Sequence, residues 1–110
     1  MSREIKFSSN YNKKLHCDYY TTIRKYTEPS CQFYSSSCNQ VYDVFCDGYL
    51  IHKAVLKGVD CQFINKVDKF LLTCDTGINN DDSIKGLFRK FGIAWTDRCL
   101  ILLFNRCENY

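Results

Sequence analysis

The sequence predicts a small α+β domain whose strands curl into a barrel-like sheet, and three stretches of the chain carry this prediction. Residues 41–46 alternate between the two faces of a strand, and Asp47-Gly48 after them is a strong signal for a two-residue hairpin turn. Residues 81–92 space their apolar side chains along one face of a helix. The continuous apolar run 99–104 is typical of a central strand covered on both sides.

Size and composition fit one domain spanning residues 1–110. With 110 residues, 45% of them hydrophobic, the chain has enough apolar material for a core without a metal or a disulfide framework. The formal net charge is +3, and the N-terminal quarter crowds its cations while the middle of the chain is acidic. This distribution indicates either a one-sided basic face or an ordinary solvated charged surface.

Eight cysteines in so short a chain raise the question of disulfides or metal ligands. No Cys-x-x-Cys pair occurs, so we expect neither a metal site nor another cofactor. No apolar run resembles a secretory signal or reaches the roughly 20 residues of a membrane span. We therefore expect a cytoplasmic protein with reduced cysteines and no membrane contact, with a Cys31–Cys38 bridge as an alternative under oxidising conditions.

The order of elements follows from short local patterns. A short strand at residues 5–7 and a short helix lead into a β-branched strand at residues 21–24. Residues 28–40, with Pro29 and three successive serines, are expected to form one long loop, either a lid or a variable insertion. In the strand after the hairpin, His52 shares a face with apolar residues and is interpreted as a core histidine. Four apolar residues at helical spacing predict the next helix: Val67, Phe70, Leu71 and Cys74.

The helix at residues 81–92 is the clearest of the chain. Its expected buried stripe consists of Ile84, Leu87, Phe88 and Phe91. Asp81, Asp82 or Ser83 is expected to cap its start, and Gly92 suits the left-handed position after its end. Gly86 inside the helix suggests close packing against another element. Trp95, just beyond it, is interpreted as a packing residue.

These pieces occur in an order that resembles a known family. The Thr-x-Arg strand "TTIR" (residues 21–24), the hairpin strand "IHKAVL", two helices and a last strand ending in "LLFNR" together resemble the ASCH domain family. That family is similar in fold to the PUA domains of RNA-modifying proteins. The resemblance implies a PUA-like, partly open β-barrel flanked by two to three short helices, with a cleft lined by the Thr-x-Arg strand.

One bacterial branch of this family removes an acyl group from N4-acetylcytidine. Its motif is Gly-x-Lys-Thr-x-Thr-x-Arg, and a carboxylate completes its site. Thr22 and Arg24 match the motif, whereas Cys17 replaces the glycine and Tyr19 replaces the lysine. Lys13 or Lys14 is the candidate to replace that lysine. Asp75, Asp81 and Asp82 are the candidate carboxylates, and the sequence does not choose among them.

We expect the domain to bind single-stranded RNA or a nucleotide-like ligand. Cations would neutralise phosphates, Arg24 would donate a bidentate fork, and a tyrosine would stack on a base. In the alternative interpretation, the strand is an exposed edge whose hydroxyl and guanidinium groups are simply solvated. The candidate nucleic-acid-binding residues are Lys13, Lys14, Tyr19, Thr22, Arg24 and Lys25.

Two other classes of function remain open. The first is an enzyme resembling the N4-acetylcytidine amidohydrolases, with Thr22 as the catalytic nucleophile and a nearby lysine as base. The loss of the motif lysine at Tyr19 argues against it. The second is a protein-interaction module with a protein partner, encoded by a virus, a phage or another mobile element. Its basis is a composition with two alanines, one proline and many Asn, Lys and Tyr residues, as AT-rich coding would produce.

Overall fold

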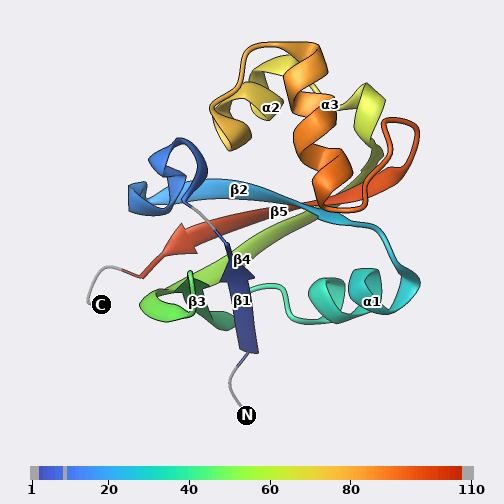
Figure 1. The fold of residues 1–110 in the computed structure, drawn as a ribbon. Helices are drawn as coiled ribbons and strands as arrows, with labels where there is room; N and C mark the ends of the chain where they lie inside the picture. Colours follow the sequence, from blue (N-terminus) through green and yellow to red (C-terminus); the bar gives the residue numbers. More distant parts are fainter. Residues whose placement is uncertain (1–2, 9, 108–110) are drawn as a thin grey trace.

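Five strands form one mixed sheet in the order β1-β3-β4-β5-β2 (Figure 1). The computed structural model describes residues 3–8 and 10–107, without the side chains of residues 11 and 12. In chain order the elements are β1 (Arg3–Phe7), the 3₁₀ helix η1 (Tyr11–His16), β2 (Tyr19–Lys25), α1 (Glu28–Ser36), β3 (Val41–Cys46), β4 (Tyr49–Phe63), the 3₁₀ helix η2 (Ile64–Lys66), α2 (Lys69–Thr76), α3 (Asp81–Lys90) and β5 (Arg98–Arg106).

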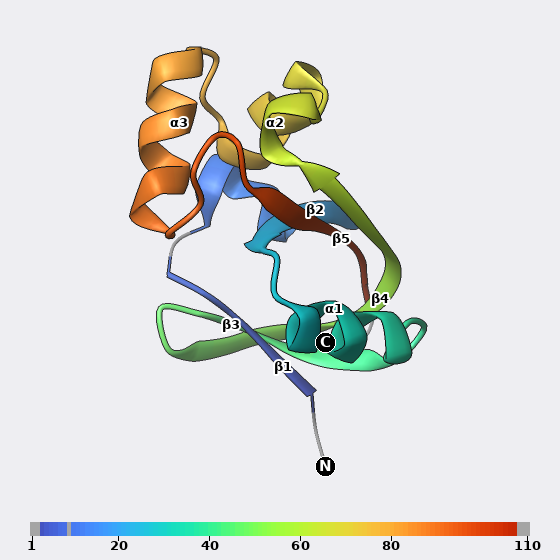
Figure 2. The ribbon, with the colours of Figure 1, turned by 90° about the vertical axis from the view of Figure 1, so that its right-hand side faces the viewer.

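The sheet is strongly curved and open. β1 pairs in parallel with β3, and the other neighbours pair antiparallel, so β1 and β2 form the two edges. Figure 2 shows the open curve, with β4 forming the bend between β3 and β5. Arg24 of β2 donates from Nη2 to the backbone oxygen of Lys6 in β1 over 3.0 Å. The predicted α+β class is confirmed, with three short α-helices and a sheet that does not close into a barrel.

The hairpin between β3 and β4 forms where the sequence predicts it. Asp47 and Gly48 both have positive φ, 51° and 83°, as a two-residue turn matched to the strand twist requires. β4 is 15 residues long and pairs first with β3 and then with β5. A register shift between Leu56 and Gly58 accompanies the change of partner, so one strand serves both halves of the curve.

The predicted long loop at residues 28–40 is wrong, because α1 occupies most of it. The Thr27 hydroxyl caps the helix by accepting from the Ser30 backbone nitrogen, 3.1 Å away. Pro29 stands in the first turn, where its missing N–H is harmless. Ser37 lies just past the last turn and donates to the Phe33 carbonyl over 2.8 Å. The proline and the serines thus lie near the ends of a helix, where they are tolerated.

Two apolar clusters stabilise the fold on opposite faces of β2 and β5. The first fills the inside of the curved sheet, with Tyr42, Leu56 and Phe104 among its fully buried members, and Tyr34 of α1 packs against it. The second lies between the outer face and helices α2 and α3, which sit together on that side in Figures 1 and 2. In β5 the residues from Cys99 to Leu102 are all buried, which confirms the predicted two-sided central strand.

In α3, the spacing of apolar residues predicts most of the buried side correctly. In α3, Ile84 and Phe88 are buried as expected, while Phe91 is 45% exposed at the end of the predicted stripe. The helix is capped by the Asn80 side chain, one residue before the expected candidates. Gly92 has the expected left-handed backbone with φ of 77°. The close packing expected at Gly86 is wrong, because a Cβ there would meet no atom of a neighbouring element within 4 Å.

The predicted helix at residues 67–74 forms as α2, but most of the apolar residues that predicted it do not form its buried side. Asp68 caps the helix by accepting from the Phe70 backbone nitrogen over 2.8 Å, so Val67 lies before the helix begins. Phe70 is 78% exposed, and the buried side is formed by Leu72, Asp75 and Thr76. A carboxylate therefore faces the sheet from this helix, which apolar spacing alone did not predict.

Candidate functional site

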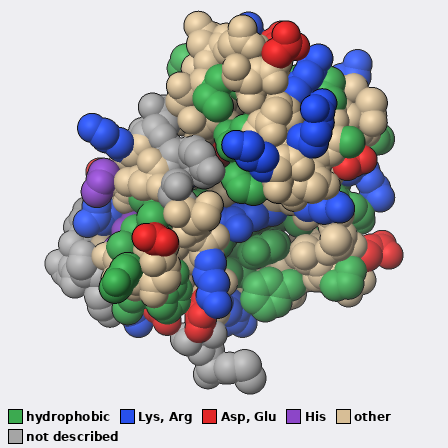
Figure 3. Space-filling view, in the orientation of Figure 1, with side chains coloured by type: hydrophobic (Ala, Val, Ile, Leu, Met, Phe, Trp, Pro, Cys, Tyr) green, Lys and Arg blue, Asp and Glu red, His purple; other side chains and the backbone are tan. Residues whose placement is uncertain are grey.

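A pocket of about 400 Å³ opens between the sheet and the outer helices. Edge strands β1 and β2 and helix η1 form one side of it, and α2 and α3 form the other. Figure 3 shows Lys and Arg side chains gathered across the middle of this face of the molecule. The volume lies in the range of small-molecule sites, which commonly occupy about 300–1,000 Å³.

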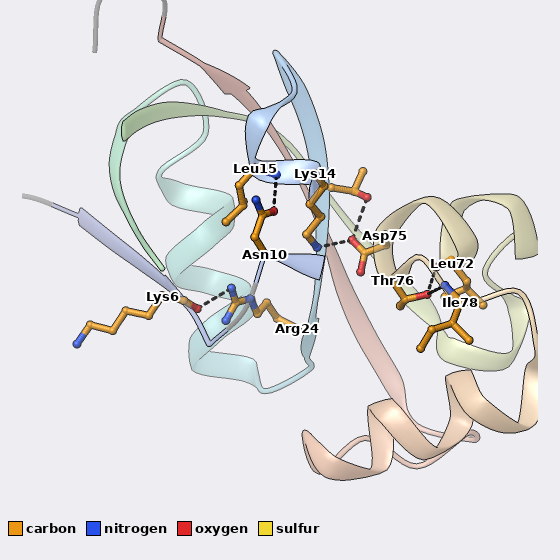
Figure 4. Close-up of polar contacts among 10 residues, drawn as sticks. Lys6, Asn10, Lys14, Leu15, Arg24, Leu72, Asp75, Thr76 and Ile78 are labelled. Carbon is orange, nitrogen blue, oxygen red and sulfur yellow. Dashed lines mark hydrogen bonds and ion pairs between the residues drawn. The ribbon is translucent and has the colours of Figure 1, made fainter. Parts of the chain in front are cut away.

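A buried ion pair lies at one end of the pocket. Lys14 Nζ and Asp75 Oδ1 are 2.9 Å apart, and their side chains are 8% and 7% exposed. The hydroxyl of Thr21 donates to the same carboxylate oxygen over 3.1 Å. Figure 4 shows Lys14 and Asp75 pointing toward one another from η1 and α2. Burial lowers the pKa of Lys14, and the Asp75 carboxylate opposes this shift.

Helix η1 determines which of its two lysines enters the pocket. Asn10 accepts from the Leu15 backbone nitrogen through Oδ1 over 2.9 Å, and the Leu15 side chain is fully buried in the first cluster. These two contacts fix the turn, with Lys14 directed inward beside Leu15. Lys13 is exposed and does not line the pocket.

Arg24 crosses the open edge of the sheet beside the pocket. Besides its bond to the Lys6 carbonyl, its guanidinium carbon lies 4.8 Å from the centre of the Phe7 ring. The Lys6 side chain points away, so that residue contributes its backbone here (Figure 4). Burial lowers the pKa of Arg24. Its Nε is buried and has no hydrogen-bond partner among the described residues. A cation is thus held here with one donor unsatisfied, a situation that favours an anionic or acceptor-rich neighbour.

The opposite wall is apolar and aromatic. Leu87 and Phe88 of α3 line it together with Phe91 and Ile93, and the Phe91 ring is partly exposed. Lys25 lies at the edge between the two walls, with its Nζ 3.8 Å from the position a Gly92 Cβ would take. The pocket therefore combines a flat apolar surface with three cations, Lys14, Arg24 and Lys25, against the single carboxylate of Asp75.

Four of the six predicted binding residues come together in this pocket, namely Lys14, Thr22, Arg24 and Lys25. Lys13 and Tyr19, the other two predicted residues, do not line the pocket. Tyr19 begins β2 opposite Asn105 and is 60% exposed, whereas Tyr20 is buried in the core, as strand alternation requires. Thr22 is 4% exposed.

Among the three candidate carboxylates, only Asp75 reaches the pocket, since Asp81 and Asp82 lie exposed at the start of α3. The sequence did not identify the apolar wall as part of a site. The spacing of Leu87, Phe88 and Phe91 predicted only a buried stripe on a helix. Whether these side chains face the core or a pocket depends on where α3 packs against the sheet.

Within residues 3–8 and 10–107, no three His, Cys, Asp or Glu side chains cluster in a way that would hold a metal ion. None of the helices covered by the structure is long and apolar enough to cross a membrane. All eight cysteines, each within the described ranges, are free thiols. Burial raises the pKa of Cys99 to about 11, consistent with an unreactive packing residue.

Comparison with known proteins gives no relative: no family model, no curated protein and no solved structure matches the chain. The resemblance to the ASCH family therefore stays a prediction that depends on the residues quoted for it.

Proposed function

We propose that the pocket beside β2 binds a nucleotide, either free or as a unit of single-stranded RNA, in a PUA-like fold of the kind that the ASCH resemblance implies. The observation that carries this proposal is the composition of the pocket. Three cations face one carboxylate, and an aromatic wall stands opposite. Phosphate suits the first feature, and the face of a nucleobase suits the second.

Each side chain has a definite part in this proposal. Arg24, held by Lys6 and Phe7, provides a fixed guanidinium for a phosphate or a base edge. Lys25 adds a mobile charge at the mouth, and the exposed Phe91 ring offers a stacking surface. Asp75 cancels the charge of Lys14 and keeps it in place. The open edge between β1 and β2 gives the ligand its entry.

A titration of cytidine 5′-monophosphate and a fluorescent single-stranded RNA at two salt concentrations tests the proposal. Lys25→Ala removes an exposed pocket cation without touching the core, so RNA affinity should fall and the salt dependence should lose about one unit of slope. Lys57→Ala is the matched control, because Lys57 is exposed on β4 and outside the pocket. Arg24→Lys keeps the charge but not the planar fork, and should weaken binding roughly tenfold.

Equal affinities for Lys25→Ala, Lys57→Ala and wild type would contradict a pocket beside β2. The absence of salt-sensitive binding in the wild type would favour the protein-interaction alternative instead. The exposed apolar run Tyr49, Leu50 and Ile51 at the start of β4 would then be the surface to mutate.

A second function, hydrolysis of an acylated cytidine, is favoured by one observation. Lys14, whose pKa is lowered by burial, shares the pocket with Thr22 and pairs with a carboxylate. In this reaction Lys14 would first give up its proton to solvent. Its amine would then take the proton of the Thr22 hydroxyl, whose oxygen would attack the acyl carbon and form an ester, and Lys14 would pass the proton to the departing cytidine amine. Water would hydrolyse the ester, which frees the acid and regenerates the hydroxyl.

Turnover of N4-acetylcytidine that disappears in the isosteric variant Thr22→Val would establish this activity. Unchanged substrate at high protein concentration would rule it out and leave the binding proposal standing.

A further inference from the structure

A second hollow of about 310 Å³ lies on the other side of the C-terminal half of α3. Lys85 and Arg89 of the helix line it together with Trp95 and Asp97, and Ile93 is common to both cavities. The last turns of α3 therefore separate two hollows, one lined by Leu87 and Phe91 and the other by Lys85 and Arg89.

Trp95 presents a flat ring in this hollow. It is half-buried, packs against the second apolar cluster, and carries Lys85 Nζ 5.2 Å from its ring centre. The expectation that Trp95 is a packing residue thus describes only part of it. An ammonium group over this aromatic face means that apolar side chains do not cover the face completely. The Lys85 side chain is long and flexible. A nucleobase can therefore take the place of its ammonium group over the ring, and the ammonium group can move to contact a phosphate.

The charges around this hollow also favour an anion with a polar base. Lys85 and Arg89 face the single carboxylate of Asp97. Asp97 Oδ2 accepts from the Ala94 backbone nitrogen over 2.9 Å, which fixes the orientation of the carboxylate. A fixed carboxylate in a base-sized hollow suits an exocyclic amino group, as cytosine and adenine have.

A basic path joins the two hollows over the end of α3. Lys25 lies at the Gly92 turn, and Arg89 and Lys90 are exposed in the last turn of the helix. In Figure 3, Lys and Arg side chains continue from the middle of the face over the outer helical layer. A helix with its side chains is about 10–12 Å across, so a mononucleotide cannot occupy both hollows, whereas a strand of several nucleotides spans them.

We infer that the Trp95 hollow is a second base-stacking subsite for the RNA strand whose first nucleotide lies beside β2. The path between the subsites crosses the C-terminal end of α3, where Lys25 and Arg89 contact the connecting phosphates. This inference rests on the proposed function and adds to it a minimum ligand length and a preference for bases with an amino group.

The chain contains one tryptophan, so tryptophan emission, excited beyond the tyrosine absorption band, reports on the surroundings of Trp95. The experiment titrates the protein with cytidine 5′-monophosphate and with a cytidine heptanucleotide, following both affinity and tryptophan emission. The heptanucleotide should bind roughly tenfold more tightly, as expected for an additional stacked base, and should quench the emission. The mononucleotide should bind without quenching.

Three single variants separate the subsites. Arg89→Ala should weaken the heptanucleotide and reduce the quenching while leaving mononucleotide affinity unchanged. Lys25→Ala should weaken both ligands, and Lys57→Ala should weaken neither. A heptanucleotide that binds without changing tryptophan emission, or that binds Arg89→Ala as well as Lys57→Ala, overturns the second subsite and leaves the first intact. Failure of both ligands to bind the wild type overturns the proposed function and this inference together.

Discussion

Two buried pairs of polar side chains in this protein have the same hydrogen-bond distance, but one is enclosed and the other borders an open pocket. The Tyr20 hydroxyl and His52 Nε2 lie 2.9 Å apart inside the curved sheet, and Lys14 and Asp75 lie 2.9 Å apart between η1 and α2. All four residues are less than 9% exposed. The first pair is enclosed by aromatic rings, with Phe104 stacked 5.9 Å from the ring of Tyr20. The second pair is at the wall of an open pocket.

The difference lies in charge as well as in access. Burial lowers the pKa of His52 to about 4 and raises the pKa of Tyr20, so this pair is neutral at pH 7. The interpretation of His52 as a core histidine is thereby confirmed. Lys14 and Asp75 form an ion pair. A buried ion pair is often no more stabilising than apolar residues of the same volume, so its presence beside a cavity favours a role in binding.

Breaking the ion pair gives the largest expected effect. Asp75→Leu removes the carboxylate and leaves the Lys14 ammonium buried without it, so the free energy of unfolding should fall by about 3 kcal/mol. The double variant Lys14→Met with Asp75→Leu removes both charges and should recover most of this loss. Urea unfolding of the wild type and the variants measures it. If the double variant were as unstable as Asp75→Leu, the ion pair would be a source of stability. Its presence beside the cavity would then no longer favour a role in binding.

The neutral pair should respond to pH. His52 binds a proton readily only in the unfolded state, where its pKa is near 6.5, so the stability due to its burial is complete above that value. It is lost as pH falls toward 4, by about 2 kcal/mol between pH 7 and pH 5. Arg106 and His16 add to the lowering of this pKa. The measurement is the free energy of unfolding at both pH values in the wild type and in His52→Gln. A pH dependence identical in the two proteins would contradict a neutral buried His52.

How much of this fold the sequence predicts depends on how local each signal is. The turn at Asp47-Gly48 and the helix around Ile84 and Phe88 are specified by neighbouring residues, and both form as expected. α1 was missed because Pro29 and the serines break a helix only in its interior, and the sequence pattern does not reveal that they lie near its ends.

The site shows the same limit more strongly. Thr22, Arg24 and Lys25 lie close together in one strand, and the Thr-x-Arg pattern with its family resemblance singled out this stretch. Lys14 and Asp75 are 61 residues apart, and only the packing of η1 against α2 selects them over Lys13, Asp81 and Asp82. The apolar spacing at residues 67–74 predicted that α2 is a helix but not that Leu72, Asp75 and Thr76 form its buried side.

The smallest expected effect tests whether the two pairs are independent. Tyr20→Phe removes one hydroxyl and leaves His52 Nε2 buried without its partner, which should lower the free energy of unfolding by about 1 kcal/mol. Affinity for cytidine 5′-monophosphate should stay unchanged, because neither Tyr20 nor His52 lines the pocket. Lys25→Ala should show the reverse, with weaker binding and unchanged stability. Tyr20 and Thr22, however, lie on the same face of β2. A loss of affinity in Tyr20→Phe would therefore mean that the Tyr20–His52 pair determines the position of β2 at the pocket. The two regions would then have to be treated as one coupled site.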